Sequence, residues 1–295
     1  MLRISDNLTF RESFTKNKSL MISYMNKSKI DLSIVIITWR MKNLLKVCLD
    51  SIYKCTKGLT FELIVIDNCS NDCTIEMIEL NFPNIILIKN RENKGVAPAR
   101  NQGIQIAKGK YVLILDADME LTEDSISQMF NFMESKESCG VVGCKLIDSA
   151  GNLQYSCKKF PTFKALLYRR LEKFSFIKNS KVLRDHTMAE WAHDKAQKVD
   201  YLIGACQFIR RDLMDQIGFY DDKIFYGPED IDYCLRAWHA GWEVWYYPFT
   251  KIFHHEQRIT KQKFFSKISA KHFIGISYLF KKYSWKLSRS NDKIN

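Results

Sequence analysis

The middle of the chain alternates between short apolar, β-branched runs and longer amphipathic segments, and this alternation constrains the fold more than any other feature. The apolar runs are typical of strands and lie at 32–38, 61–67, 85–89, 111–118 and 139–148. The segments between them are typical of helices and lie at 41–54, 74–82, 97–109 and 121–135. Strands that alternate with helices form βαβ units around a mainly parallel sheet, so the sequence predicts an α/β fold.

Charge is distributed unevenly along the 295 residues. Of the formal net charge of +12, residues 1–30 carry six basic and two acidic groups, and residues 257–295 carry ten basic and one acidic. The middle is close to neutral, whereas an enzyme acting on nucleic acid usually lines its groove with positive charge. We therefore expect no nucleic-acid partner, and we expect the basic ends to favour an anionic membrane surface.

Three regions follow from these patterns. We expect a polar N-terminal arm at 1–30, one α/β domain at 31–256 and a basic, amphipathic helical tail at 257–295. The tail mixes lysine with Phe, Ile, Tyr and Trp, which suits a helix at an anionic interface. A helix packed on the domain with its lysines in solvent would give the same pattern.

The expected location rests on three features of the sequence. The N-terminus lacks a secretory-signal pattern, and no apolar run reaches the roughly 18 residues needed to span a bilayer. The nine cysteines form no CxxC pair, so we interpret them as reduced thiols. We expect a cytoplasmic protein that is peripheral at the inner face of the cell membrane.

Two aspartates close the apolar run at 111–118. Because side chains of an extended chain alternate, Asp116 and Asp118 are predicted to project to the same side. Mg²⁺ and Mn²⁺ prefer carboxylate oxygens and keep positions open for phosphate and water. The alternative is a strand that ends in a polar turn, with Asp118 capping the next helix.

Two further polar segments follow predicted strands. Asp67 ends the second strand and Asn68 begins a polar loop, at the edge where α/β sheets bind ligands. A carboxylate there can accept from a nucleobase or ribose, although Asx-rich loops also form turns and caps. Gly95 permits close backbone approach, and Arg100 offers a fork to phosphate or to an acidic loop, unless it is simply a solvated arginine.

Acids and histidines also stand at the ends of predicted elements near the C-terminus. Glu229 and Asp230 begin a predicted helix at 228–240, where the helix dipole favours negative charge. Capping explains one acid, and the other could act as general base toward an acceptor hydroxyl. His254 and His255 follow a predicted strand at 242–248, and either one could complete a metal site or pack as a neutral ring.

Together these motifs resemble the family 2 glycosyltransferases with the GT-A fold, in particular the bacterial rhamnosyl- and galactofuranosyltransferase-like branch. The resemblance covers about residues 32–256 and is carried by VIDNCSND, NKGVAPARNQGIQIAKGKYVLILDAD and GPEDIDYCLRAWHAGWEVWYYP. It implies a Rossmann-like, mostly parallel central sheet flanked by helices, with a basic C-terminal helical extension.

The resemblance also implies how the donor is bound. Thr38, Trp39 and Arg40 match the segment that lies against the nucleobase and ribose, and Asp67, with Asn68 beside it, matches the aspartate that bonds the base. Further nucleotide-sugar contacts fall to Gly95, Arg100, Ala117, Gly204, Ala205 and Cys206.

The resemblance gives the remaining acids their roles. Asp116 and Asp118 match the pair whose Mn²⁺ or Mg²⁺ bridges the two donor phosphates, and His254, rather than His255, matches a metal-binding histidine. Asp230 matches the catalytic base.

Glu229, next to Asp230 in the sequence, would contact the acceptor. The implied function is an inverting, metal-dependent transfer from a UDP-, dTDP- or GDP-sugar to a saccharide or lipid-linked acceptor in cell-surface polysaccharide synthesis. Two alternatives stay open: a sugar nucleotidyltransferase, which normally has a glycine-rich loop where this chain reads TWRMKN, and a non-catalytic, membrane-associated adaptor with a degenerate transferase fold.

Overall fold

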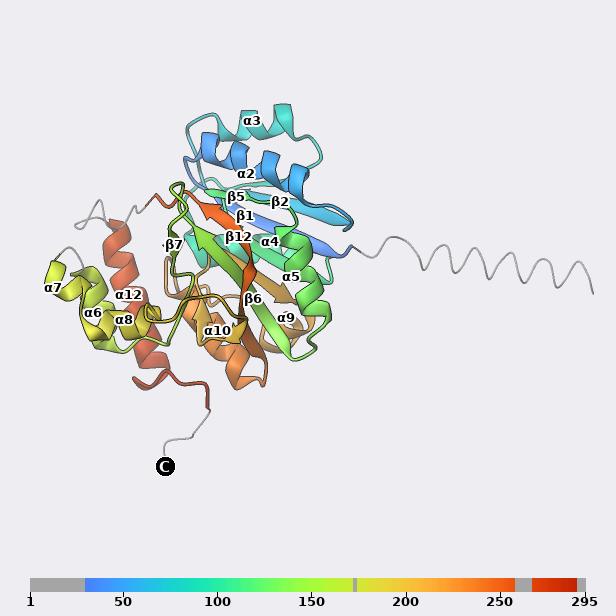
Figure 1. Cartoon of the computed structure of the whole chain (residues 1–295). Helices are drawn as coiled ribbons and strands as arrows, with labels where there is room; N and C mark the ends of the chain where they lie inside the picture. Colours follow the sequence, from blue (N-terminus) through green and yellow to red (C-terminus); the bar gives the residue numbers. More distant parts are fainter. Residues whose placement is uncertain (1–29, 172–173, 258–266, 291–295) are drawn as a thin grey trace, which may run out of the picture.

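The computed structural model describes residues 30–171, 174–257 and 267–290, which are organised around one ten-stranded sheet (Figure 1). Its strands are β1 Leu32–Thr38, β2 Phe61–Asp67, β3 Ile86–Lys89, β4 Tyr111–Asp116, β5 Met119–Leu121, β6 Cys139–Ile147, β7 Leu153–Gln154, β9 Gln197–Lys198, β11 Cys206–Arg210 and β12 Glu243–His254. A second, two-stranded sheet pairs β8 Cys157–Lys158 with β10 Tyr201–Leu202. The predicted arm at 1–30 lies, except for its last residue, outside the described residues.

The main path of the large sheet has the order β3-β2-β1-β4-β11-β6-β12-β5. Strands β3, β2, β1, β4, β6 and β12 run in one direction, and β11 is antiparallel to both of its neighbours, β4 and β6. The predicted α/β fold with a mostly parallel central sheet is therefore confirmed. The parallel register also brings Thr38 level with Asp67, and Ile37 level with Asp116, at one edge of the sheet.

Helices cover both faces of the sheet, which explains why its central strands are apolar on both sides. The helices are α2 Lys42–Cys55, α3 Thr74–Asn81, α4 Val96–Ile106, α5 Ser125–Glu134, α6 Phe163–Arg170, α7 Ser175–Lys178, α8 Lys181–Thr187, α9 Arg211–Ile217, α10 Glu229–His239 and α12 Lys267–Lys282. Helices α2, α3 and α5 share one core cluster with Ile34 and Ile36 of β1. Helices α4, α9 and α10 share the other with Val35.

Two strands differ by more than one residue from their predicted bounds. The predicted strand at 111–118 ends at Asp116, and Ala117 and Asp118 form a turn into the short strand β5. The predicted strand at 242–248 continues to His254, because β12 passes a register shift between Tyr247 and Lys251 and then resumes pairing. Proline is tolerated in sheets at such irregularities, and Pro248 lies within this one.

The segment at 155–195 contains α6, α7 and α8, which gather with α12 beside the sheet (Figure 1). Helix α6 begins after Thr162, whose hydroxyl accepts a hydrogen bond from the Ala165 amide at 3.1 Å. Helix α12 packs on the domain through buried Leu279 and Phe280. Within the described ranges, none of the helices combines the length and apolar character that crossing a bilayer requires.

Candidate active site

A pocket of about 380 Å³ opens at the carboxyl ends of β1 and β4 and at the start of α10. Most of the residues predicted to form a site line it together, although they come from distant parts of the chain. They are Trp39, Asn68, Gly95, Arg100, Asp116, Ala117, Asp118, Gly204, Ala205, Glu229, Asp230 and His254. The parallel sheet explains the convergence, because the carboxyl ends of its strands meet at one edge.

Four predicted residues do not line the pocket. Thr38, Asp67 and Cys206 are buried, and Arg40 is exposed with its guanidinium 5.0 Å from the centre of the Trp39 ring. One Asp67 oxygen accepts from the Ser70 amide at 3.0 Å. Its other oxygen and the Thr38 hydroxyl, level with it on the next strand, have no hydrogen-bond partner among the described residues.

Asn68 and Gly95 shape the rim of the pocket. The Asn68 amide donates to the Asn93 side chain at 3.0 Å and to the Gly95 carbonyl at 3.1 Å. Its oxygen accepts from Asn90 and from the Lys94 amide, so its hydrogen-bonding capacity is used by the protein. Gly95 has φ +92, and a Cβ there would lie 2.4 Å from the Phe225 carbonyl, so glycine allows these two loops to meet.

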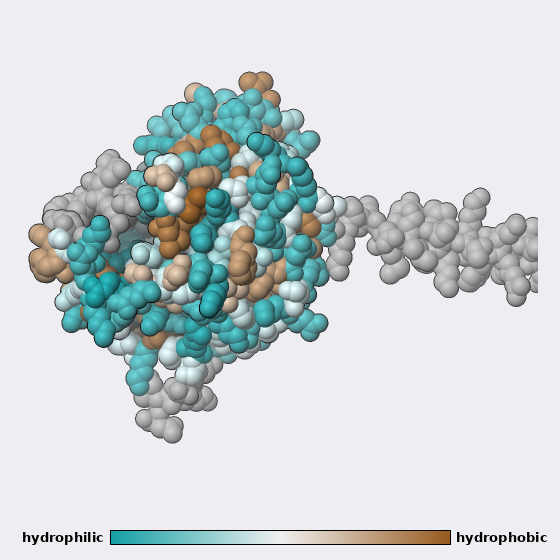
Figure 2. Space-filling model, viewed as in Figure 1, coloured by the Kyte–Doolittle hydropathy of each residue, from teal (hydrophilic) through white to brown (hydrophobic). Residues whose placement is uncertain are grey.

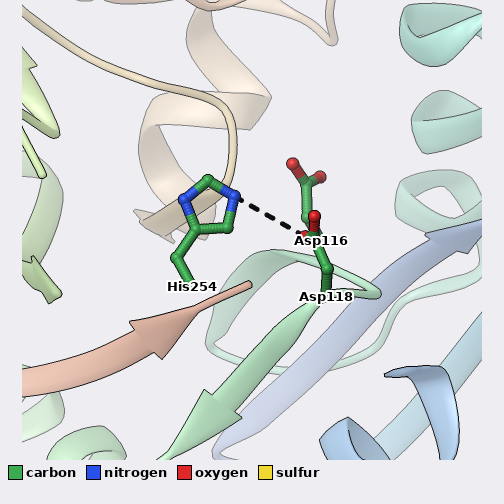
Figure 3. A group of neighbouring side chains, drawn as sticks. All are labelled: Asp116, Asp118 and His254. Atoms are coloured by element: carbon green, nitrogen blue, oxygen red, sulfur yellow. Dashed lines mark ion pairs between the residues drawn. The ribbon is translucent and has the colours of Figure 1, made fainter. Parts of the chain in front are cut away.

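Asp116, Asp118 and His254 bring one ligand atom each to within 4.8 Å of one another (Figure 3). His254 Nε2 lies 3.6 Å from an Asp118 oxygen. The pairing of His254 with Met119 between β12 and β5 places the ring beside the turn that carries Asp118. His255 instead contacts Glu120 at 2.9 Å, so the structure brings His254 to the aspartates.

Gln154, which the sequence analysis did not identify, holds the His254 ring. Its amide nitrogen donates to the His254 carbonyl at 2.9 Å, which turns its oxygen toward His254 Nδ1 at 2.6 Å. An oxygen accepts only, so Nδ1 carries a proton, and when the ring is neutral its Nε2 keeps the lone pair that a metal ligand needs. Metal-binding histidines are commonly oriented by such a second hydrogen bond.

The electrostatics of the aspartate pair fit a divalent cation. Asp118 is 6% exposed, and burial together with the Asp116 carboxylate raises the pKa of Asp118 to about 7. Two facing carboxylates and an imidazole nitrogen form a donor set that Mn²⁺ and Mg²⁺ accept. A cation between them would relieve the repulsion that raises this pKa.

Arg100 is 3% exposed and joins three parts of the site. Its guanidinium donates to Asp116 at 2.8 Å, to Glu229 at 3.0 Å and to the Gly204 carbonyl at 2.8 Å. Although burial disfavours its charge, Asp116 and Glu229 raise the pKa of Arg100 above its usual range. Of its two predicted partners, phosphate or acidic side chains, the guanidinium binds the acidic side chains in this structure.

Gly204 links Arg100 to the predicted base. A Cβ at Gly204 would lie 2.4 Å from the Arg100 Nη1 atom, so only glycine leaves room for the guanidinium. The Gly204 amide also donates to one Asp230 oxygen at 3.1 Å, and the Ile231 amide donates to the other at 2.8 Å. Asp230 is thereby fixed at the start of α10, facing the pocket.

The two neighbouring acids have different surroundings. Burial raises the pKa of Glu229 to about 7 despite its Arg100 partner, and Glu229 is 6% exposed. Asp230 is half-buried, and burial also raises its pKa, which Lys158 opposes. Lys158 lines the same pocket from β8, a two-residue strand that the sequence pattern does not reveal.

The mostly parallel sheet with carboxylates clustered beyond its strand ends is the arrangement expected of GT-A glycosyltransferases. The chain belongs to glycosyl transferase family 2, whose family model matches residues 33–218. The predicted family is therefore confirmed, and the chain is a glycosyltransferase.

Known relatives agree with this assignment. The chain is 24% identical over 222 residues to N-acetylglucosaminyl-diphospho-decaprenol L-rhamnosyltransferase of Mycobacterium tuberculosis. This match covers 71% of this chain and 71% of the relative. It is 25% identical over 236 residues to poly(ribitol-phosphate) beta-glucosyltransferase of Bacillus spizizenii, covering 70% of this chain and 37% of the relative.

A solved structure shows the same fold. It is a mannosyltransferase from Pyrobaculum calidifontis in complex with GDP-Man and Mn²⁺. The TM-score is 0.61 at 19% identity, and the match covers 88% of this chain and 66% of that chain.

Proposed function

We propose that this glycosyltransferase uses a divalent cation and inverts the anomeric centre as it moves a sugar from a nucleotide-diphosphosugar donor to a saccharide or lipid-linked acceptor. One observation carries the proposal: Asp116, Asp118, His254 and Asp230 meet at a single pocket although more than a hundred residues separate some of them. Asp116, Asp118 and His254 form a cation-binding side of the pocket. The half-buried Asp230 carboxylate, at the start of α10, forms the other side.

The cation-binding side would hold the donor diphosphate. Asp116, Asp118 and His254 would hold Mn²⁺ or Mg²⁺, which supplies positive charge to the departing nucleoside diphosphate when it is bound. Arg100 fixes the position of Asp116 through their 2.8 Å ion pair. The Trp39 side chain lines the pocket and offers a flat surface to the nucleoside.

The acceptor side would use Asp230 as general base. The acceptor oxygen attacks the anomeric carbon as the bond from that carbon to the phosphate oxygen breaks, and the acceptor proton passes to an Asp230 oxygen. Amide donors from Gly204 and Ile231 hold one oxygen each, which fixes the carboxylate while other lone pairs face the pocket. Glu229 is buried against Arg100, so we assign it to positioning that guanidinium in addition to its predicted contact with the acceptor.

The acceptor class and the cellular location belong to the same proposal. The mycobacterial relative is named for the lipid-linked N-acetylglucosaminyl-diphospho-decaprenol, which supports a lipid-linked acceptor here. A peripheral position at the inner face of the cell membrane would place such an acceptor near the pocket. We also propose that the chain divides into an arm at 1–30, a domain at 31–256 and a tail at 257–295.

Removal of the cation tests this function. Protein stripped with EDTA should lose transfer, and Mn²⁺ or Mg²⁺ should restore it, because the two aspartates repel a diphosphate without a cation. The cation should also raise the melting temperature in the presence of one of UDP-, dTDP- or GDP-sugars, since ligands of the native state stabilise it.

Two matched variants sharpen this test. Asp118→Asn should lose the response to cation, whereas Asp124→Asn, an exposed aspartate at the start of α5, should keep it. Transfer that persists undiminished in excess chelator would contradict the metal-dependent mechanism.

A further inference from the structure

Exposed apolar side chains are concentrated on one group of helices. Of the fourteen large hydrophobic side chains that are exposed within the described residues, seven lie on or next to α6, α7 and α12. They are Phe163, Leu167, Phe174, Phe176, Phe273, Ile274 and Trp285. Single exposed hydrophobics are ordinary, but a concentration on neighbouring helices indicates an interaction surface.

The three helices are held together beside the sheet. Leu166 of α6 packs with Ile276 and Phe280 of α12, and the Phe163 ring lies 5.9 Å from the Phe280 ring. Figure 1 shows α6, α7 and α8 next to α12, at the side of the molecule away from α5. Figure 2 shows pale brown side chains at the edge where α7 projects.

This group of helices is also strongly basic. Residues 163–187 contain seven basic and two acidic groups, and α12 contains four basic and no acidic residues. The middle of the chain is close to neutral in total charge but contains this basic segment. The expectation that only the ends are basic is therefore wrong. Exposed lysines among the exposed aromatics include Lys164, Lys178, Lys181, Lys271 and Lys281.

The same helices border the pocket. Leu166 and Arg169 of α6, with His272 and Ile276 of α12, form part of its lining. Two of the helices that carry the exposed aromatics and lysines, α6 and α12, therefore also line the pocket.

We propose that α6, α7 and α12 form a docking surface for an anionic lipid bilayer. Aromatic side chains such as Phe176 and Phe273 enter the headgroup region, and the surrounding lysines bind lipid phosphates. Interleaved aromatic and basic residues with few acids match an anionic lipid surface. The orientation this gives the pocket, toward a lipid-linked acceptor, rests on the proposed function, but the docking itself does not.

Vesicle co-sedimentation of the full chain tests the docking surface. Wild type should sediment with vesicles of equal parts phosphatidylglycerol and phosphatidylcholine, and less with phosphatidylcholine alone or in high salt. The double variant Phe176→Ser, Phe273→Ser should reduce partitioning about tenfold, because two apolar contacts are lost. A matched control, Leu80→Ser with Phe249→Ser, removes two exposed apolar side chains on α3 and β12 and should bind as wild type.

A charge-reversal pair tests the basic part of the surface. Lys178→Glu with Lys181→Glu should weaken binding by about 30-fold or more, since the attraction of two lysines to the anionic surface is lost and reversal adds repulsion. Lys54→Glu with Lys57→Glu, on exposed positions at the end of α2, is the matched control. Equal melting temperatures should show that all variants fold.

The proposal is overturned if wild type does not sediment with anionic vesicles. It is also overturned if the Phe176/Phe273 and Lys178/Lys181 variants bind the vesicles as tightly as their controls. Sedimentation needs neither donor nor cation, so its result stands apart from the transferase assay. Truncation at residue 257 is a poorer test, because it would also remove the buried Leu279 and Phe280 from the domain.

Discussion

Gln154 contacts His254 at two points, through its amide nitrogen to the His254 carbonyl at 2.9 Å and through its oxygen to Nδ1 at 2.6 Å. The first contact fixes the orientation of the amide, and the second fixes the tautomer of the ring. His254 Nε2 lies 3.6 Å from an Asp118 oxygen. A glutamine on a two-residue strand thus orients the histidine that we propose as a cation ligand.

Removal of this contact should weaken cation binding. Gln154→Leu should lower the affinity for Mn²⁺ by about 10- to 100-fold, the usual effect of losing a group that orients a metal ligand. Gln154→Glu keeps an acceptor for Nδ1 and should retain most of the affinity. Mn²⁺ titration followed by electron paramagnetic resonance measures this, with Gln105→Leu on the exposed side of α4 as the control. Unchanged affinity in Gln154→Leu would remove Gln154 from the site.

Gly204→Ala should disturb Arg100 without touching a charged group. The new Cβ would lie 2.4 Å from Arg100 Nη1, so the guanidinium must move and its ion pairs with Asp116 and Glu229 must loosen. We expect a loss of about 1–3 kcal/mol in the free energy of unfolding, as for other overpacked sites.

A double-mutant cycle isolates the cause. In an Arg100→Ala background, Gly204→Ala should reduce the free energy of unfolding little further, because the clash is gone. Strictly additive effects, measured by denaturant unfolding, would show that Gly204 acts independently of Arg100.

The sequence predicts the sheet well because local pattern determines it. Apolar runs mark β1 and β2 at their observed bounds, Leu32–Thr38 and Phe61–Asp67, since strands covered on both faces must be apolar throughout. The motifs of the family also occur along this chain in the order that the family has them, so the sequence alone reveals them. The pattern fails at 155–195, because the aromatic and basic residues of α6 and α7 are exposed rather than turned toward a core.

Site residues were predictable only where a motif carries them. Asp116, Asp118 and Asp230 follow recognisable strand and helix boundaries, whereas Gln154 and Lys158 lie on two-residue strands without a motif. The burial of Arg100 depends on Gly204 and Glu229, more than a hundred residues later. Such contacts are set by the tertiary fold and leave no local signal.

His186 should contribute less to folding stability in mild acid, because it is buried as a neutral ring. Its Nδ1 donates to the Lys159 carbonyl at 2.9 Å, and burial with nearby Arg169 and Lys158 lowers the pKa of His186 from 6.5 to about 2. The unfolded chain therefore binds a proton below pH 6.5 that the folded chain does not. The contribution of His186 to the free energy of unfolding should decline below that pH by up to about 1.4 kcal/mol per pH unit, whereas the raised pKa values of Asp118 and Glu229 act in the opposite direction.

Urea unfolding between pH 7 and pH 5 measures this slope. His186→Gln lowers stability at neutral pH, but its deficit relative to wild type should shrink toward pH 5, because glutamine does not titrate. Equal slopes for wild type and His186→Gln would exclude His186 as a source of acid sensitivity.

Asp230→Asn tests the central claim most directly. The variant keeps the shape of the side chain but cannot accept the acceptor proton, so transfer should fall by about 10²- to 10⁴-fold. Donor affinity in the presence of Mn²⁺, measured by calorimetry, should stay close to wild type, and the exposed neighbour Asp222→Asn should leave both unchanged. Loss of transfer with intact donor binding is the result we predict, and an Asp230→Asn enzyme that turns over like wild type would contradict the account.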